Sequence, residues 1–257
     1  MTSRRVRQRR AIALGVGVLV VLISLVACVT VLQKTSDNVP FPQTAQPPEW
    51  GKNVDPATSP SLPLADLADT TWLTRTAAQT GIPERALAAY AGAALRLSVT
   101  NPECGITWTT LAGIGWVESH HGAIFGGRIL ENGSMNEPVF GITLDGDNGT
   151  LALPDFDDGN FDLDPNGDRA VGPMQIIPPT WAAWHIDANL DGVEDGQSID
   201  DSVLAAAGYL CYSSDSMTNA EGWNTSIRAY NDVPIYATDV AAKAEEYAQT
   251  VSCVIFC

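Results

Sequence analysis

The dominant pattern along this chain is a helical repeat of apolar positions, which begins near residue 71. Segment 82–97, IPERALAAYAGAALRL, is rich in alanine and carries Pro83 where helices accept a first-turn proline. Segments 106–120 and 199–212 are apolar enough to form two further helices. These patterns predict a core built mainly from helices.

Two more helices are predicted toward the C-terminus. Segment 218–231 begins with Thr218 and Glu221 at the spacing of a capping box. In segment 238–251 the apolar residues form one helical stripe. They are Val240, Ala244, Tyr247, Ala248 and Val251.

Strand patterns are weak. Segments 138–144 and 169–177 could each hold a short strand, and between them lies an acidic loop, residues 145–168, with eight aspartates. We therefore expect a mostly α fold. It would form a single globular domain, residues 71–257, after an N-terminal transmembrane helix.

The transmembrane helix is predicted from residues 11–32, which carry no charge and are long enough to span a bilayer. Five arginines within residues 1–10 place this basic tail in the cytoplasm. An alternative is a signal segment ending in LVAC, with Cys28 as the lipidated residue of a lipoprotein. Either interpretation puts the remainder outside the cytoplasm, at the cell membrane.

Residues 33–70 contain seven prolines and many polar residues. This composition predicts an extended stalk between membrane and domain. The alternative is an ordered N-terminal segment that wraps onto the domain.

Charge and cysteine content narrow the class of protein. The net charge is −16, and all thirty acidic residues follow residue 10, which argues against a nucleic-acid partner and suits calcium. Besides Cys28, four cysteines remain, and in an exported segment they indicate two disulfides. Of the three pairings that they allow, we favour Cys104–Cys211 with Cys253–Cys257.

Glu118 is the main candidate for chemistry. On a helix over 107–118 it shares a face with Leu111, Ile114 and Gly115, so it ends an apolar stripe. Loss of water there would raise its pKa, and a carboxyl group that is neutral near pH 7 can act as a general acid. A structural capping or pairing role is the alternative.

Three ordered motifs, GWVESHHG (115–122), AVGPMQIIPPTWAAW (170–184) and AYN (229–231), resemble the lysozyme-like lytic transglycosylases of bacterial cell walls. The closest resemblance, over about residues 75–250, is to the lytic transglycosylase B family in its membrane-anchored actinobacterial form. It implies that Glu118 protonates the glycosidic oxygen between N-acetylmuramic acid and N-acetylglucosamine. The same residue would then accept the proton of the muramoyl C6 hydroxyl, which attacks C1 and forms a 1,6-anhydro end.

The resemblance also implies roles for other residues. It implies that five residues contact the substrate: Ser119, Gln175, Tyr230, Asn231 and Tyr236. Each has a structural alternative, in a turn or in the core. The chain departs from the family pattern at Val233, where a serine is common.

A calcium site is expected in the loop DANLDGVED. Asp187, Asn189, Asp191 and the Val193 carbonyl match EF-hand positions one, three, five and seven. The usual glutamate at position twelve is missing, but the family can close a longer loop with a later aspartate, here Asp201, with Asp200 or Asp195 as alternatives. A solvated turn is the alternative. The acidic loop shows no EF-hand register, so no metal is assigned to it.

Histidines do not predict a zinc enzyme, because His120 and His121 are adjacent and cannot share one helix face. The sequence therefore predicts a peptidoglycan lytic transglycosylase, a glycan-cleaving lyase whose partners are glycan strands and the membrane. Two alternatives remain. One is a hydrolytic muramidase with a second carboxylate hidden in the acidic loop, and the other is a non-catalytic peptidoglycan-binding protein.

Overall fold

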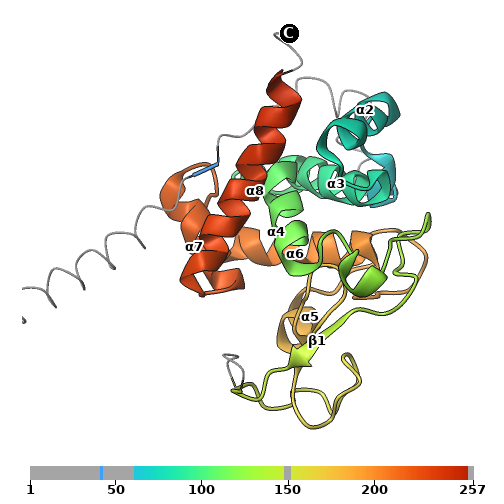
Figure 1. Cartoon of the computed structure of the whole chain (residues 1–257), viewed down its shortest axis with the longest axis vertical. Helices are drawn as coiled ribbons and strands as arrows, with labels where there is room; N and C mark the ends of the chain where they lie inside the picture. The colour runs from blue at the N-terminus through green and yellow to red at the C-terminus, as the bar shows by residue number, and fades with distance from the viewer. Residues whose placement is uncertain (1–40, 43–60, 148–151, 254–257) are drawn as a thin grey trace, which may run out of the picture. The chain divides into compact units, whose positions relative to one another are not determined.

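The computed structural model describes residues 41–42, 61–147 and 152–253, all within one compact unit, Pro40–Cys257. This part of the chain holds seven α-helices and one two-stranded sheet (Figure 1), so the predicted mostly α class is confirmed. The helices are α2 (Thr70–Thr80), α3 (Glu84–Thr100), α4 (Trp108–Ser119), α5 (Pro178–Trp184), α6 (Ile199–Ser213), α7 (Ala220–Tyr230) and α8 (Pro234–Cys253).

None of the described helices has the length and apolar character needed to cross a membrane. The predicted anchor, residues 11–32, and most of the predicted stalk lie outside the described residues.

The last ten residues of the predicted stalk, 61–70, belong to the globular unit. The short 3-10 helix η2 (Leu64–Asp66) buries Leu64 completely and is followed by the buried Leu67. It packs closely on α3, where a Cβ on Gly92 would lie 2.0 Å from the Leu64 carbonyl oxygen. Residues 61–70 therefore pack on the domain as an ordered segment, and Pro42 is buried as well. The extended stalk stays a prediction for the stalk residues outside the described part.

Helix α4 is buried along its first two turns, and only Trp116, Val117 and Glu118 near its end are in contact with solvent. It packs against α8 and α3, and glycines permit the close approach. A Cβ on Gly113 would lie 2.8 Å from the Val240 carbonyl oxygen of α8, and one on Gly115 would lie 2.1 Å from the Tyr90 hydroxyl of α3. The buried position of α4 fixes the end of the helix that carries Glu118.

Five helices match segments whose patterns predict them, within a few residues at each end. One cap prediction is wrong. Helix α7 begins one residue later than the capping box requires, because the Asn219 side chain accepts the Gly222 N–H at 3.0 Å and caps the helix.

The two predicted strands form an antiparallel pair, β1 (Phe140–Thr143) with β2 (Arg169–Val171). Phe140 lies opposite Val171 and Thr143 opposite Arg169, with an irregularity between them. The pair closes the base of the acidic loop and leads from β2 directly into residues 172–175.

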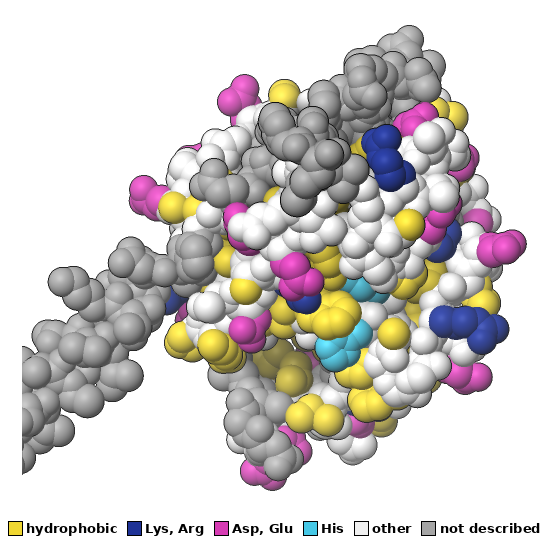
Figure 2. Space-filling view, turned by 45° about the horizontal axis from the view of Figure 1, so that its top comes forward, with side chains coloured by type: hydrophobic (Ala, Val, Ile, Leu, Met, Phe, Trp, Pro, Cys, Tyr) yellow, Lys and Arg dark blue, Asp and Glu magenta, His cyan; other side chains and the backbone are white. Residues whose placement is uncertain are grey.

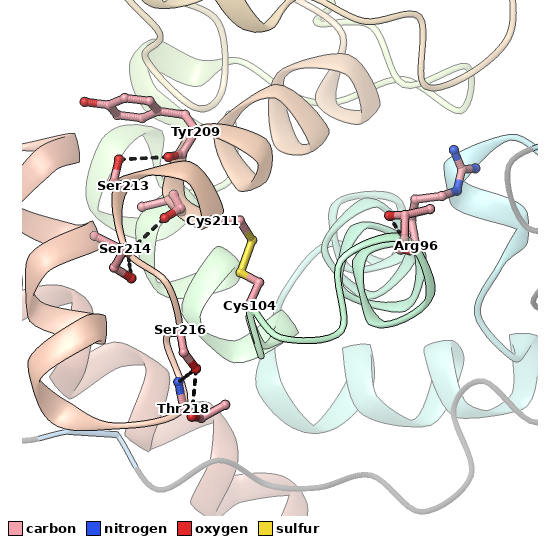
Figure 3. The surroundings of a disulfide bond; sticks show 11 residues. Arg96, Cys104, Tyr209, Cys211, Ser213, Ser214, Ser216 and Thr218 are labelled. Carbon is pink, nitrogen blue, oxygen red and sulfur yellow. Dashed lines mark hydrogen bonds between the residues drawn. A yellow bond between two sulfur atoms is a disulfide. The ribbon is translucent and has the colours of Figure 1, made fainter.

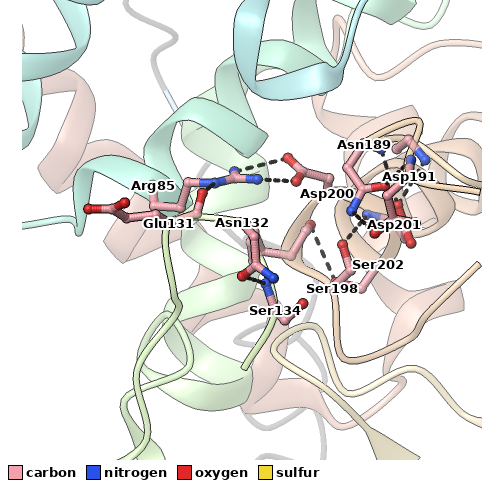
Figure 4. Close-up of polar contacts among 12 residues, drawn as sticks. Arg85, Glu131, Asn132, Ser134, Asn189, Asp191, Ser198, Asp200, Asp201 and Ser202 are labelled. Carbon is pink, nitrogen blue, oxygen red and sulfur yellow. Dashed lines mark hydrogen bonds and ion pairs between the residues drawn. The ribbon is translucent and has the colours of Figure 1, made fainter. Parts of the chain in front are cut away.

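Two covalent or ionic links join distant parts of the domain. The favoured disulfide Cys104–Cys211 is present, with a Cα–Cα distance of 5.3 Å, and it ties the α3–α4 connection to α6 (Figure 3). Cys257 lies outside the described residues, so the second pairing stays a prediction. Figure 4 shows the other link, in which the Arg85 guanidinium of α3 forms a bidentate ion pair with the fully buried Asp200 of α6.

Candidate active site

Glu118 lies in the last turn of α4. Thr107 caps the start of the helix, because its side chain accepts the Thr110 N–H, and the helix ends because His120 takes a left-handed backbone conformation, with φ 51°. His121 continues this conformation with φ 57°. The chain therefore turns away sharply just after Glu118 and leaves its carboxyl group at the exposed end of a buried helix.

The carboxyl group of Glu118 is only partly accessible to solvent and is surrounded by dense protein. This burial raises the pKa of Glu118 to about 7, although a hydrogen bond from Tyr236 acts in the opposite direction. Its place at a helix C-terminus also disfavours negative charge. At neutral pH the group is therefore close to half protonated, which suits both donation and acceptance of a proton.

Tyr236 is the direct partner of Glu118. Its hydroxyl donates to Glu118 Oε1 at 2.5 Å from the first turn of α8, and its side chain is almost fully buried. The Tyr236 ring stacks beside that of Tyr230, with centroids 6.5 Å apart and an interplanar angle of 13°. Burial, then the nearby Glu118, raises the pKa of each tyrosine well above its usual value, so both hydroxyls remain protonated donors.

Gln175 closes a tight turn, residues 172–175, which we call the glutamine turn. Gln175 itself has a φ of 50°, and its side-chain Nε2 donates to the Gly172 carbonyl at 2.9 Å. Gly172 is required by space as well as by its φ of 75°, since a Cβ there would lie 1.8 Å from the Gly196 carbonyl oxygen. Above the turn, a pocket of about 90 Å³ brings Gln175 and Tyr230 together.

Two helices hold the glutamine turn in place. The Ser119 hydroxyl, next to Glu118, donates to the Pro173 carbonyl at 2.6 Å and accepts the Gly122 N–H at 2.8 Å. The Tyr230 hydroxyl donates to the Met174 carbonyl at 2.6 Å. Ser119 is 1% exposed, so its hydroxyl serves inside the protein rather than facing a substrate.

Asn231 follows Tyr230 at the C-terminal end of α7. Its side-chain Oδ1 accepts the Val233 N–H at 3.1 Å, which shapes the short connection to α8. The structure thus brings Glu118, Tyr236, Tyr230 and Gln175 into one region. Ser119 and Asn231 hold the backbone turns around these four residues through their hydrogen bonds.

Sequence reasoning missed the role of His121. This side chain is 3% exposed and lies between two tyrosine hydroxyls, 3.0 Å from that of Tyr90 and 2.9 Å from that of Tyr247. Burial first, then the charges of His120 and Lys243, lowers the pKa of His121 to about 3. His121 is therefore a neutral link between α3 and α8 beneath the site.

A second hollow, about 360 Å³, lies on the other side of the α4 end. It is lined by α4 and α8 residues and holds Lys243, whose ammonium lies 4.4 Å from the centroid of the Trp116 ring. On the face seen in Figure 2, acidic side chains are spread over the surface, while histidine side chains lie among hydrophobic ones.

The predicted calcium loop is closed by Asp201. This aspartate is fully buried, and its carboxylate accepts the N–H groups of Ala188 at 2.8 Å and Asp195 at 3.0 Å. Asp187 and Asp191 likewise accept N–H groups within the loop. The oxygen donors fit calcium in type, and these hydrogen bonds already fold the loop onto α6.

Oxygens of Asp187, Asp191 and Asp201 do not form a close group of three. Within the described residues, the acidic side chains that do so are Asp155, Asp157 and Asp168 of the acidic loop, which offer one oxygen each, all within 4.8 Å of one another. These three aspartates lie close together although the acidic loop lacks the residue spacing of an EF-hand.

In comparisons with known proteins, no family model, curated protein or solved structure matches the chain. The functional assignment therefore rests on the motifs and on the geometry described above.

Proposed function

We propose that this protein is a lytic transglycosylase with a lysozyme-like catalytic domain, which cleaves the β-1,4 bond between N-acetylmuramic acid and N-acetylglucosamine in peptidoglycan. One observation carries the proposal. Glu118 is a buried carboxyl group whose pKa is raised to about 7, and it lies beside Tyr236 and Tyr230 near a pocket that also contains Gln175. These are residues to which the motif resemblance gives roles in this reaction.

The proposed reaction uses Glu118 twice. The protonated carboxyl group donates its proton to the bridging oxygen, and the C1–oxygen bond breaks. The resulting carboxylate then takes the proton of the muramoyl C6 hydroxyl, whose oxygen bonds to C1, so Glu118 ends protonated and no water is consumed. The hydrogen bond from Tyr236 stabilises the carboxylate between the two steps.

Catalysis by a single carboxyl group is supported by the charges around Glu118. Burial and Tyr236 are the causes of its pKa shift, with no described carboxylate among them. The acidic loop could supply the second carboxylate of a hydrolase, but three of its aspartates converge on one another. Glycosidases that use water place two carboxyl groups about 5–9.5 Å apart across the bond.

The other site residues would position the glycan. Gln175 and Tyr230 line the pocket and would hydrogen-bond or stack on a sugar. Ser119 and Asn231 would act through the backbone that they hold. A calcium ion in the 187–201 loop would be structural, held by Asp187, Asn189, Asp191, the Val193 carbonyl and Asp201, and would take no part in proton transfer.

The proposal includes the location of the enzyme. The basic tail and apolar segment would anchor the chain in the cell membrane, with the domain outside the cytoplasm facing peptidoglycan. Cys28 as a lipid anchor is the alternative.

Mass spectrometry of released muropeptides tests the reaction. Purified peptidoglycan is digested with the full-length chain, with Glu118→Gln, and with Glu103→Gln as a control for the same charge change at an exposed position. We expect 1,6-anhydromuramoyl ends from the wild type and from Glu103→Gln, and none from Glu118→Gln. Reducing ends would indicate a hydrolytic muramidase instead. Wall binding without any product would indicate a non-catalytic binder.

A further inference from the structure

The acidic loop contains a cluster of three aspartates that the proposed reaction does not use. Asp155 and Asp157 lie in one turn, and Asp168 immediately precedes strand β2. The chain folds back so that the Asp168 carboxylate accepts the Phe156 N–H at 2.9 Å, between the other two aspartates. One oxygen from each of the three lies within 4.8 Å of the other two.

The hydrogen bonds of the loop leave two carboxylate oxygens of these aspartates unused. Both oxygens of Asp155 accept main-chain N–H groups, from Asp158 at 2.9 Å and from Gly159 at 3.1 Å. Asp157 Oδ1 and Asp168 Oδ2 are fully buried and have no hydrogen-bond partner among the described residues. Asp168 as a whole is 1% exposed.

Buried carboxylate oxygens of this kind are costly unless something supplies positive charge or a donor. The guanidinium of Arg169, the residue after Asp168, faces Asp164 at 3.9 Å, donates to the Asp162 carbonyl and covers the Phe140 ring. Another acidic side chain, Asp162, is buried nearby and is held by the Arg169 main-chain N–H.

We propose that Asp155, Asp157 and Asp168 bind a calcium ion, at a site separate from the 187–201 loop. The donors are all carboxylate oxygens, which select hard cations over zinc or copper. An irregular loop of this kind suits the variable coordination of calcium better than the strict octahedron of magnesium. Asp155 and Asp157 are half-buried, so water can complete the coordination from the open side.

The ion would fasten the acidic loop to β2. That strand continues into the glutamine turn, and Phe161 of the loop stacks on Trp181 of α5, with centroids 5.1 Å apart and an interplanar angle of 9°. Calcium would therefore order the wall of the domain beside Gln175. The site does not depend on the reaction proposed above, because binding is measured without substrate.

Calorimetric titration of calcium into the full-length chain, purified in detergent and freed of metal with a chelator, tests the proposal. The variants are Asp168→Asn, Asp157→Asn and, as a control in the same loop, Asp158→Asn, whose side chain is exposed and outside the cluster. Asp187→Asn reports separately on the 187–201 loop. We expect Asp168→Asn and Asp157→Asn to bind one calcium ion fewer than wild type, whether or not Asp187→Asn also loses one.

Thermal unfolding gives a second measurement, which compares the melting temperatures of Asp168→Asn and wild type in chelator and in calcium. In chelator, Asp168→Asn should melt at or above the wild-type temperature, because it removes one of three crowded negative charges. At a calcium concentration about 100 times the dissociation constant, calcium should raise the melting temperature of wild type by about 5–10 °C more than that of Asp168→Asn, which keeps only the contribution of the 187–201 loop. Equal calcium stoichiometry in wild type and Asp168→Asn, or preferential binding of magnesium, would overturn the proposal.

Discussion

Replacing Glu118 with glutamine should stabilise the folded domain at alkaline pH and have no such effect at acid pH. An unfolded chain ionises this carboxyl near its usual pKa of 4.5, whereas burial raises the value in the folded domain to about 7. Between these values the folded state holds a proton that the unfolded chain has lost, so stability falls as pH rises through this window. Below pH 4.5 both states are protonated and the group has no effect.

The magnitude follows from the two pKa values. Each pKa unit corresponds to about 1.4 kcal/mol, so ionised Glu118 lowers the free energy of unfolding by at most about 3–4 kcal/mol above pH 7. Partial contact with solvent reduces this figure. Glutamine is neutral throughout and can still accept the hydrogen bond from Tyr236, so it removes the charge without removing the contact.

Guanidinium unfolding of segment 40–257, which spans the compact unit, measures the effect at pH 4, 6 and 8. The quantity of interest is the difference between Glu118→Gln and wild type, because other titrating groups cancel in it. It should rise between pH 4.5 and 7 and level off above. Glu103→Gln, exposed at the surface, should give no comparable rise. A difference that stays constant from pH 4 to pH 8 would refute the argument that burial governs Glu118.

Three further predictions concern a hydrogen bond, an ion pair and a disulfide. Tyr236→Phe removes a donor to the carboxylate, so the pKa of Glu118 should rise further by about 1–2 and the alkaline limb of the pH–activity profile should move up with it, while the maximal rate falls. Arg85→Met leaves Asp200 buried without its partner and should cost about 3–5 kcal/mol in denaturant unfolding, which Arg85→Met/Asp200→Leu should largely restore. Loss of the Cys104–Cys211 disulfide, by serine replacement of both cysteines, should lower the unfolding free energy by about 2–5 kcal/mol, and an unchanged midpoint would contradict this.

The helices and strands could be predicted from the sequence because their signals are local. Apolar patterns located α3, α4, α6 and α8, a capping-box spacing located α7, and the two short strands fell inside the expected segments. Helix ends were less certain, because capping depends on which of several polar side chains reaches the first N–H groups. At α7, Asn219 prevailed over Thr218.

Features that depend on long-range packing could not be predicted in this way. Leu64 lies in a proline-rich segment that suggests a stalk, yet α3 offers Gly92 as a flat surface against which it is buried. Ser119 follows the catalytic candidate in sequence, but its hydroxyl is directed to Pro173, 54 residues away. The Asp155–Asp157–Asp168 cluster has no regular spacing because the fold of the loop, rather than a repeat, brings its members together.

The same kind of packing connects the acidic loop to the candidate active site through the glutamine turn. Its carbonyl groups accept hydrogen bonds from Ser119 on α4 and Tyr230 on α7, while β2 enters it directly from Asp168. Glu118, by contrast, lies on a helix enclosed by α3 and α8. A change that loosens the acidic loop should therefore displace Gln175 and weaken glycan binding, whereas the pKa of Glu118, which burial and Tyr236 determine, should stay near 7. In the proposed enzyme, different parts of the fold would thus control substrate affinity and proton transfer.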